Sequence, residues 1–200
     1  MQADPDPTPV MNLLQDFRRS QVMFAAVSLG VFDRLVAGPA PLPRLATELG
    51  VDADALGRLL DAAVSLSLLA KSGDGYANTA TAEAYLTSHS PRRLTGYLRY
   101  SGAVLWQLWY HLADAVREGT HRWRQTYGTD GPIFSHFFRT DVDRREFLMG
   151  MHGQGMLSSP QVVAAFDLGR FRRLVDLGGA TGHLVVAACQ RYQEIGRAHV

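Results

Sequence analysis

The spacing of apolar side chains predicts a long helix over residues 11–36. Apolar positions recur there at the three- and four-residue intervals of an α-helix, and Gly30 is expected to interrupt the run. The positions that carry this pattern are Leu13, Leu14, Phe17, Val22, Phe24 and Ala25. They are more numerous than one buried face requires, which indicates that a second surface of the helix is covered, with another chain as one candidate.

Two shorter helices and a hairpin are predicted next. Residues 41–50 have apolar side chains at positions i, i+3, i+4 and i+7 and end on Gly50, a residue type that commonly follows the last helical turn. Asp52 can cap a second helix with the same spacing. Residues 70–77 then form two short extended pieces around a glycine-rich turn. Helix, turn, helix and hairpin is the order of a winged helix.

Winged helices often bind DNA, but the charges of this one oppose that function. The second helix carries Asp52, Asp54 and Asp61 against Arg58 alone, three acids against one base and so a formal charge of −2. A recognition helix needs basic or amide side chains to meet phosphates and base edges. A DNA-binding transcriptional regulator is therefore disfavoured and is kept as the alternative function.

Two later helices carry side chains with more than one interpretation. A helix over residues 102–118 places Trp106, Trp109 and Tyr110 on its apolar side, where packing between helices is favoured over lining a pocket for a flat substrate. A further helix capped by Thr140 runs to about residue 166, with Pro160 as a kink or restart. It contains Gly150, Gly153 and Gly155, which indicate either close approach by a backbone or ligand, or an irregular helix end.

The composition limits the class of protein. The net charge is +1 without a basic or acidic block, which argues against a chain that coats nucleic acid or an anionic membrane. Residues 1–10 predict a disordered tail because acids and prolines replace the basic and apolar regions of a signal peptide. No apolar run reaches the about 18 residues of a membrane span. Cys189, the single cysteine, lies in an apolar run, and a buried thiol in a reducing, cytoplasmic setting is expected.

Residues 173–189 predict a buried strand, a glycine turn and an apolar helix. This is the first βα unit of a doubly wound sheet, in which ligands bind beyond the carboxyl end of the strand. The turn has the spacing Asp176-x-Gly178-x-Ala180-x-Gly182, with an acid two residues before the first glycine. That spacing differs from the G-x-G-x-x-G of dinucleotide sites and resembles motif I of methyltransferases.

The chemistry of S-adenosylmethionine (SAM) fits such a turn. SAM lacks a phosphate and has a cationic ammonium and sulfonium, which suit the carboxylate of Asp176. Backbone groups of the turn can meet its carboxylate and ribose. Ala180 departs from the glycine that is usual at its position, and its methyl is tolerated where φ is negative but otherwise crowds the cofactor.

Several segments in the same order resemble the acetylserotonin (hydroxyindole) O-methyltransferase family. The likeness runs over residues 12–193 and includes residues 21–33, 85–87, 111–119, 165–168 and 175–179. It implies a mainly α chain as given, with a winged-helix-like dimerisation domain over 11–95, connecting helices and a pocket wall over 96–170, and the start of an α/β Rossmann-like domain over 171–193. It also implies a homodimer formed through residues 11–36.

The resemblance further implies the site residues. The glycine turn, with Gly178, Gly179 and Ala180, is expected to hold the cofactor. Phe138 falls where a family member has a cofactor-contacting tyrosine, so that a hydroxyl contact is lost. Gly155 falls on a family tryptophan and is expected to open the substrate pocket, with Met151 and Met156 in its wall.

The family mechanism is direct methyl transfer to a hydroxyl group of a small aromatic molecule, without a metal. A histidine removes the hydroxyl proton, and the oxygen attacks the sulfonium methyl group in line. That histidine lies well beyond the glycine turn and outside this chain. His183 is expected to face solvent, and His111, His136 and His152 to be structural.

The last residues depart from the expected pattern. Glu194–Val200 match the translation of a sequencing adapter, so we expect residues 194–200 not to be native and the natural protein to continue for roughly 150 residues or more. As a fragment, the polypeptide is expected to be inactive and to expose an unpaired parallel strand. A dimerisation module without catalysis is the third possible function.

Overall fold

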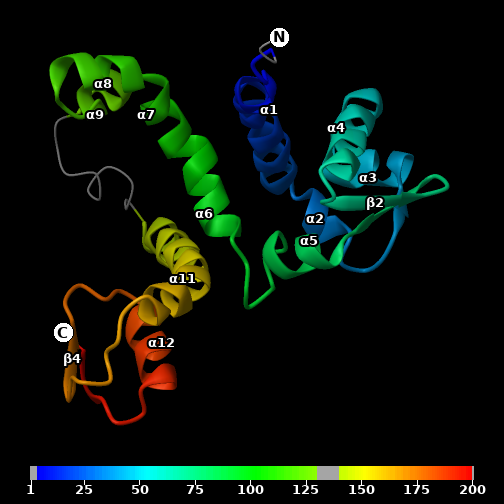
Figure 1. The fold of residues 1–200 in the computed structure, drawn as a ribbon. Coiled ribbons are helices and arrows are strands. Elements are labelled where there is room, and N and C mark those ends of the chain that lie inside the picture. The colour runs from blue at the N-terminus through cyan, green and yellow to red at the C-terminus, as the bar shows by residue number, and fades with distance from the viewer. Residues whose placement is uncertain (1–3, 130–139, 200) are drawn as a thin grey trace. The chain divides into compact units, whose positions relative to one another are not determined.

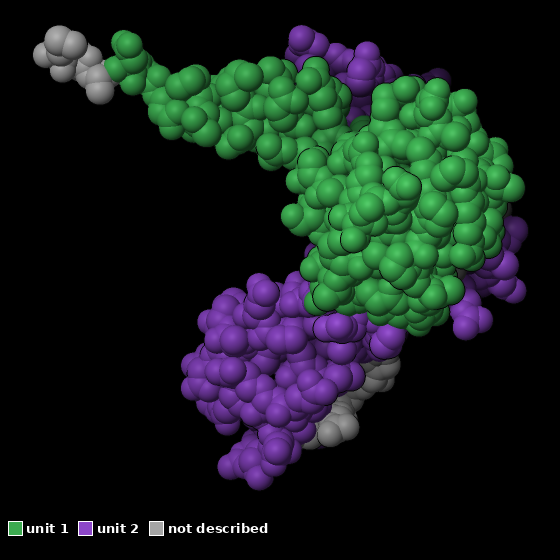
Figure 2. Space-filling view, turned by 90° about the vertical axis from the view of Figure 1, so that its right-hand side faces the viewer, with its two compact units in different colours: residues 1–90 green, residues 91–200 purple. Residues whose placement is uncertain are grey.

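The computed structural model describes residues 4–129 and 140–199. The chain divides into two compact units, Met1–Ser90 and Pro91–Val200, and each is described by itself (Figure 2). Within the described part the fold is mainly helical, as predicted. None of the described helices combines the length and apolar character that crossing a bilayer requires.

The long N-terminal helix α1 (Thr8–Leu29) ends at Gly30, which adopts a left-handed conformation with φ of 77°, and α2 (Val31–Arg34) follows (Figure 1). The break at Gly30 is therefore confirmed. The expected disordered tail over residues 1–10 is wrong for residues 8–10, which form the first turn of α1. The prolines permit this start because the first helical turn needs no N–H donor from them.

The two shorter helices lie where the sequence predicts them. Helix α3 (Leu42–Leu49) ends at Gly50, which has a φ of 65°. Helix α4 (Ala53–Ser65) begins where the Asp52 carboxylate accepts a 2.8 Å hydrogen bond from the N–H of Ala55. These local capping interactions explain why both boundaries are legible in the sequence.

A three-stranded antiparallel sheet completes the winged-helix order. Strands β2 (Leu69–Ser72) and β3 (Gly75–Asn78) form the predicted hairpin. A third strand not predicted from the sequence, β1 (Ala40–Pro41), pairs with β3 and gives the strand order β1-β3-β2. Two residues are too few for an alternating pattern to be visible. Helix α5 (Ala80–Tyr85) follows the sheet.

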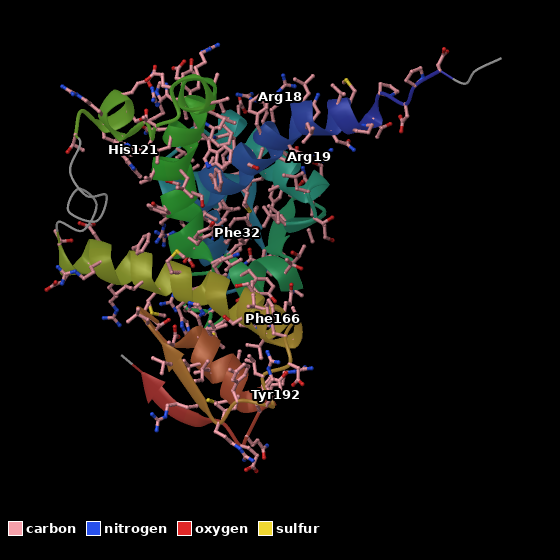
Figure 3. The ribbon with its side chains drawn as sticks, turned by 60° about the vertical axis from the view of Figure 1, so that its left-hand side comes forward. Arg18, Arg19, Phe32, His121, Phe166 and Tyr192 are labelled. Carbon is pink, nitrogen blue, oxygen red and sulfur yellow. The ribbon has the colours of Figure 1, made fainter. Side chains whose placement is uncertain are left out.

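The core of unit 1 lies between these helices and the sheet. Its largest fully buried apolar side chains are Phe32, Leu45, Leu60, Leu69 and Val31, of which Figure 3 labels Phe32. The Asn78 amide donates hydrogen bonds to the Phe32 carbonyl oxygen (2.9 Å) and to the Glu83 carboxylate (2.8 Å). These bonds join α2, β3 and α5 at the edge of the apolar core.

A polar cluster ties α4 to the hairpin. Asp61 Oδ1 accepts hydrogen bonds of 2.7 Å from both the Lys71 ammonium and the Tyr76 hydroxyl. The Lys71 ammonium also lies 4.8 Å from the centre of the Tyr76 ring. The Lys71 hydrogen bond, followed by that of Tyr76, holds the pKa of Asp61 below its ordinary value of 3.8. Asp61 thus has a structural role at the junction of α4 and the hairpin.

The lowered pKa of Asp61 leads to a pH-dependent stability. A carboxyl whose pKa is depressed by folding stabilises the protein above its unfolded pKa, and this contribution disappears as the pH falls through the folded value. We expect Asp61→Asn to lower the melting temperature slightly at neutral pH, by the small amount usual for an exposed pair. The difference from wild type should close below pH 3.8, the ordinary value. Thermal melts at several pH values test this, and a difference that persists in acid would contradict it.

The first helices of unit 2 differ from the single helix predicted over residues 102–118. The segment begins earlier, with α6 (Thr95–Tyr100), and continues through a π-helical turn, η1 (Ser101–Leu105), into α7 (Trp106–Tyr110). It breaks at His111 and resumes as α8 (Leu112–Glu118). Helix α9 (Trp123–Tyr127) follows. Neither the break at His111 nor the start of α9 has a proline or a glycine from which it could be predicted.

Two of the aromatic side chains of α7 do not pack in the core that the sequence favours, whereas Trp106 is half-buried. Trp109 is 66% exposed and Tyr110 is 83% exposed. An open apolar cleft lies between α7, α8 and α9, and His121, which Figure 3 labels, lies at it. Its lining residues are Leu108, Trp109, Leu112, Ala115, His121, Arg122 and Trp123.

The described residues from 140 onward form one long helix followed by a βαβ unit. Helix α11 (Asp141–Ala164) starts at the predicted cap, where Thr140 and Asp143 exchange hydrogen bonds, and it continues through Pro160. Strand β4 (Arg173–Asp176), helix α12 (His183–Arg191) and strand β5 (Gly196–His199) follow. The Tyr192 hydroxyl donates a 2.9 Å hydrogen bond to the Phe166 carbonyl oxygen, and Figure 3 labels both residues.

Strand β4 has a partner, contrary to the expectation of an unpaired strand. It pairs in parallel with β5, with Asp176 opposite His199 in the register. The partner strand falls on residues 194–200, for which a non-native origin stays a prediction. Val175 on β4 is still 54% exposed, because two strands cover little of a parallel sheet that normally packs helices on both faces.

Candidate functional site

The turn between β4 and α12 has the conformation that a glycine-rich loop provides. Gly178 and Gly182 have φ angles of 71° and 75°, in the left-handed region that favours glycine. The N–H of Gly182 donates a 2.7 Å hydrogen bond to the carbonyl oxygen of Gly179, which closes the turn. A Cβ built on Gly178 would meet nothing within 4 Å. The turn is therefore open on the Gly178 side.

Ala180 adopts a strained conformation rather than the negative φ under which its methyl is tolerated. Its φ is 48°, which costs an alanine roughly 1–2 kcal/mol. Its side chain is exposed. The turn is consequently not filled by the Ala180 methyl group, although the chain accepts local strain to keep the loop shape.

Asp176 lies at the carboxyl end of β4, where the turn begins. Its side chain is half-buried, and its Oδ2 atom is buried without a hydrogen-bond partner among the residues that the structure describes. Burying a carboxylate oxygen without a partner is unfavourable, so such an atom calls for an explanation. A cationic ligand in the turn would supply the missing partner.

Helix α11 holds the turn and the start of α12 through two histidine–hydroxyl contacts. His152 Nδ1 lies 2.8 Å from Thr181 Oγ1, and His183 Nδ1 lies 2.9 Å from Ser159 Oγ. His183 therefore packs half-buried against α11 and does not face solvent as expected. The sequence analysis misses these pairs because their partners are 29 and 24 residues apart.

The three glycines of α11 are explained by close approach to neighbouring groups. A Cβ on Gly150 would collide with the backbone nitrogen of Tyr97, and one on Gly153 would collide with the Arg93 carbonyl oxygen. Both contacts allow α6 and the residues before it to lie directly against α11. This confirms the interpretation of close backbone approach over that of an irregular helix end.

The residues expected to wall the substrate pocket differ in their surroundings. Gly155 opens no space, because the His183 ring fills the position that a side chain would occupy, with ring carbons 2.5 Å from an added Cβ. Met151 is half-buried, whereas Met156 is 41% exposed. Phe138 lies outside the described residues. The substrate-wall roles stay predictions.

The other chemistry-bearing groups of unit 2 lie apart from the turn. No residue of the glycine turn lines the apolar cleft of α7–α9. Within residues 4–129 and 140–199, no group of three or more His, Cys, Asp or Glu side chains could hold a metal ion. The cofactor candidates that the structure brings together are thus Asp176, Gly178, Gly179, Ala180 and Gly182, with Thr181 anchored to α11.

Comparisons with known proteins match both parts of the chain. Residues 11–88 match the model of the O-methyltransferase dimerisation domain, and residues 109–198 match that of the O-methyltransferase domain. Acetylserotonin O-methyltransferases of Macaca mulatta and Homo sapiens are each 39% identical over 183 residues, which cover 88% of this chain and 53% of the relative.

A solved structure shows the same arrangement of elements. The crystal structure of human N-acetylserotonin methyltransferase in complex with SAM has a TM-score of 0.81 at 33% identity, covering all of this chain and 60% of that one. The chain spans about half the length of the curated relatives it matches. Residues 11–88 match a dimerisation domain, so the comparisons give no support to DNA binding by the winged helix.

Proposed function

Because the chain belongs to the O-methyltransferase family, we propose that it is part of an enzyme that transfers a methyl group from SAM to a hydroxyl group of a small aromatic molecule. The observation that carries this proposal is the Asp176 carboxylate at the start of the glycine turn, whose Oδ2 atom is buried without a hydrogen-bond partner among the described residues. A carboxylate at the start of a glycine turn suits a ligand that carries positive charge.

The residues of the turn fit SAM in charge and in shape. Asp176 would face its cationic groups, and the backbone of Gly178, Gly179, Ala180 and Gly182 would meet its polar groups. When bound, SAM supplies an electrophilic methyl group on a sulfonium. The part of this chain is to bind and orient that group, since alignment of the reacting atoms contributes much of the rate in a direct displacement.

Three histidines of the described part are held in contacts with neighbouring polar side chains. His152 and His183 are hydrogen-bonded to hydroxyl groups that hold the turn. His111 lies 4.0 Å from the Asp114 carboxylate at the break between α7 and α8. We assign the catalytic base to none of the three, in agreement with the sequence analysis.

We propose further that the protein is a homodimer through residues 11–36. The first half of α1 stands clear of the rest of unit 1 (Figures 2 and 3). That half presents a run of exposed apolar side chains, Val10, Met11, Leu13, Leu14 and Phe17. A projecting apolar helix in a dimerisation domain is suited to packing against a second copy of itself.

The single, half-buried Cys189 agrees with a cytoplasmic setting.

Isothermal titration calorimetry with SAM tests the cofactor assignment in the complete protein. We expect saturable binding with one site per chain. Transfer of labelled methyl groups from SAM to a panel of phenols, with the matched O-methyl ethers as blanks, tests the reaction. Absence of SAM binding would remove the enzyme proposal, whereas SAM binding without transfer to any phenol would refute only the aromatic hydroxyl acceptor.

A further inference from the structure

One face of α11 contacts both α12 and the glycine turn. His152, Gly155, Ser159 and Val163 are spaced at i, i+3, i+7 and i+11, which places them on one stripe of the helix. His152 contacts Thr181 of the turn, Gly155 and Ser159 contact His183, and Val163 packs in an apolar cluster with Ala187 and Ala188. The stripe therefore runs from the turn to the middle of α12.

The apolar and the polar contacts along this stripe restrain the position of α12 to different degrees. The apolar cluster at Val163 is non-directional, so on its own it allows α12 to slide or rotate slightly. Ser159 is 3% exposed, and its hydroxyl oxygen lies 2.9 Å from Nδ1 of His183, the first residue of α12. A hydrogen bond in a buried place is directional and costly to leave unmade. It therefore fixes the register of α12 against α11.

Gly155 is what makes this hydrogen bond possible. The ring of His183 lies over Gly155, and a Cβ there would be 2.5 Å from three of its ring carbons. Any side chain at position 155 would therefore force the imidazole away from Ser159. Gly155 and Ser159 are four residues apart on α11, so one helical turn provides both the space and the anchor.

We propose that Gly155, Ser159 and His183 are positioning residues that set the affinity for the methyl donor. His183 follows Gly182, the last glycine of the turn, so fixing its ring fixes the end of the loop that holds the donor. His152 holds Thr181 in the same loop from the same stripe. The proposal rests on the proposed function, because it assigns these three residues a role in SAM binding.

A double-mutant cycle between positions 155 and 183 in the complete protein tests the proposal. Gly155→Ala is expected to weaken SAM binding roughly tenfold, because the new methyl group displaces the ring. His183→Ala is expected to weaken it by a similar factor, since the buried Ser159 hydroxyl loses its partner. The double variant should bind no worse than His183→Ala alone, because the added methyl group then meets no ring, so that the two losses are not additive. Calorimetry provides the dissociation constants.

A matched pair of serine variants separates the effect of the Ser159–His183 hydrogen bond from general effects of substitution on α11. Ser159→Ala removes the hydroxyl that contacts His183, whereas Ser158→Ala removes one that only donates to the Gln154 carbonyl oxygen of the same helix. We expect a severalfold loss of SAM affinity for Ser159→Ala and none for Ser158→Ala. At saturating SAM and acceptor, kcat of the Ser159→Ala enzyme should stay near that of wild type, because the anchor acts on donor binding.

Melting temperatures measured without SAM show whether a substitution changes stability, SAM affinity or both. Gly155→Ala should lower the melting temperature by about 5 °C through overpacking, and His183→Ala should restore part of that loss. If this stability cycle shows coupling while SAM affinity is unchanged, the contact is purely structural and the proposal is wrong. Additive effects in both cycles would refute the contact itself. If wild-type protein does not bind SAM at all, the proposed function fails and this role fails with it.

Discussion

Replacing Asp176 with asparagine should reduce the affinity of the complete protein for SAM by about 30-fold or more. Removing one member of a buried, hydrogen-bonded charge pair costs roughly 2–5 kcal/mol, and about 1.4 kcal/mol corresponds to a factor of ten. Asparagine keeps the shape of the side chain but not the negative charge that suits a sulfonium and an ammonium. Titration calorimetry of both proteins at the same ionic strength measures the change.

The stability of the same variant should change in the opposite direction. Asp176 Oδ2 is buried without a partner among the described residues, so its charge is unfavourable in the ligand-free fold. We expect the variant to melt at a temperature equal to or above that of wild type when SAM is absent. Asp167→Asn, which changes an exposed carboxylate bonded only to the N–H of Gly169, is the matched control and should leave SAM affinity unchanged.

Aspartate at two apolar positions of α1 should convert the proposed dimer into monomers. Leu13 and Leu14 are 74% and 53% exposed in the single chain, so the change Leu13→Asp with Leu14→Asp is tolerated by an isolated unit 1. In a dimer the two carboxylates would be buried against apolar surface, which is costly without a partner charge. We expect the dimer dissociation constant to rise more than 100-fold, as measured by sedimentation at micromolar concentration.

An exposed valine elsewhere provides the control for this change. Val142 on α11 is 70% exposed, and Val142→Asp introduces the same charge on an equally accessible apolar side chain outside residues 11–36. It should leave the oligomeric state unaltered. Equal dissociation by both variants, or a wild-type protein that is monomeric at these concentrations, would contradict an interface formed by α1.

The sequence predicts those parts of the fold whose signals are local. Gly30 and Gly50 end helices because the left-handed region is open to glycine, and Asp52 begins one because its carboxylate reaches a free N–H three residues on. The strand, turn and helix around Asp176 are legible for the same reason. Each of these features depends on a few neighbouring residues and on rules that do not involve tertiary packing.

Other features depend on residues that are distant along the chain. The break at His111 and the π-helical turn before α7 arise in a segment with continuous helical propensity. The sequence indicates free space at Gly155, because no neighbouring residue reveals that the ring of His183 occupies the position of a side chain there. The positive φ of Ala180 is equally hidden, because alanine normally avoids that conformation.

A crystal structure of the complete protein grown with SAM tests the central claim most directly. The account predicts that the methionine end of SAM lies in the turn of Gly178 and Gly179, with a cationic group of the ligand within hydrogen-bonding or ion-pairing distance of Asp176 Oδ2. It also predicts that the ring of His183 stays over Gly155. Density for SAM elsewhere, with the turn empty and Asp176 still without a partner, would contradict the account.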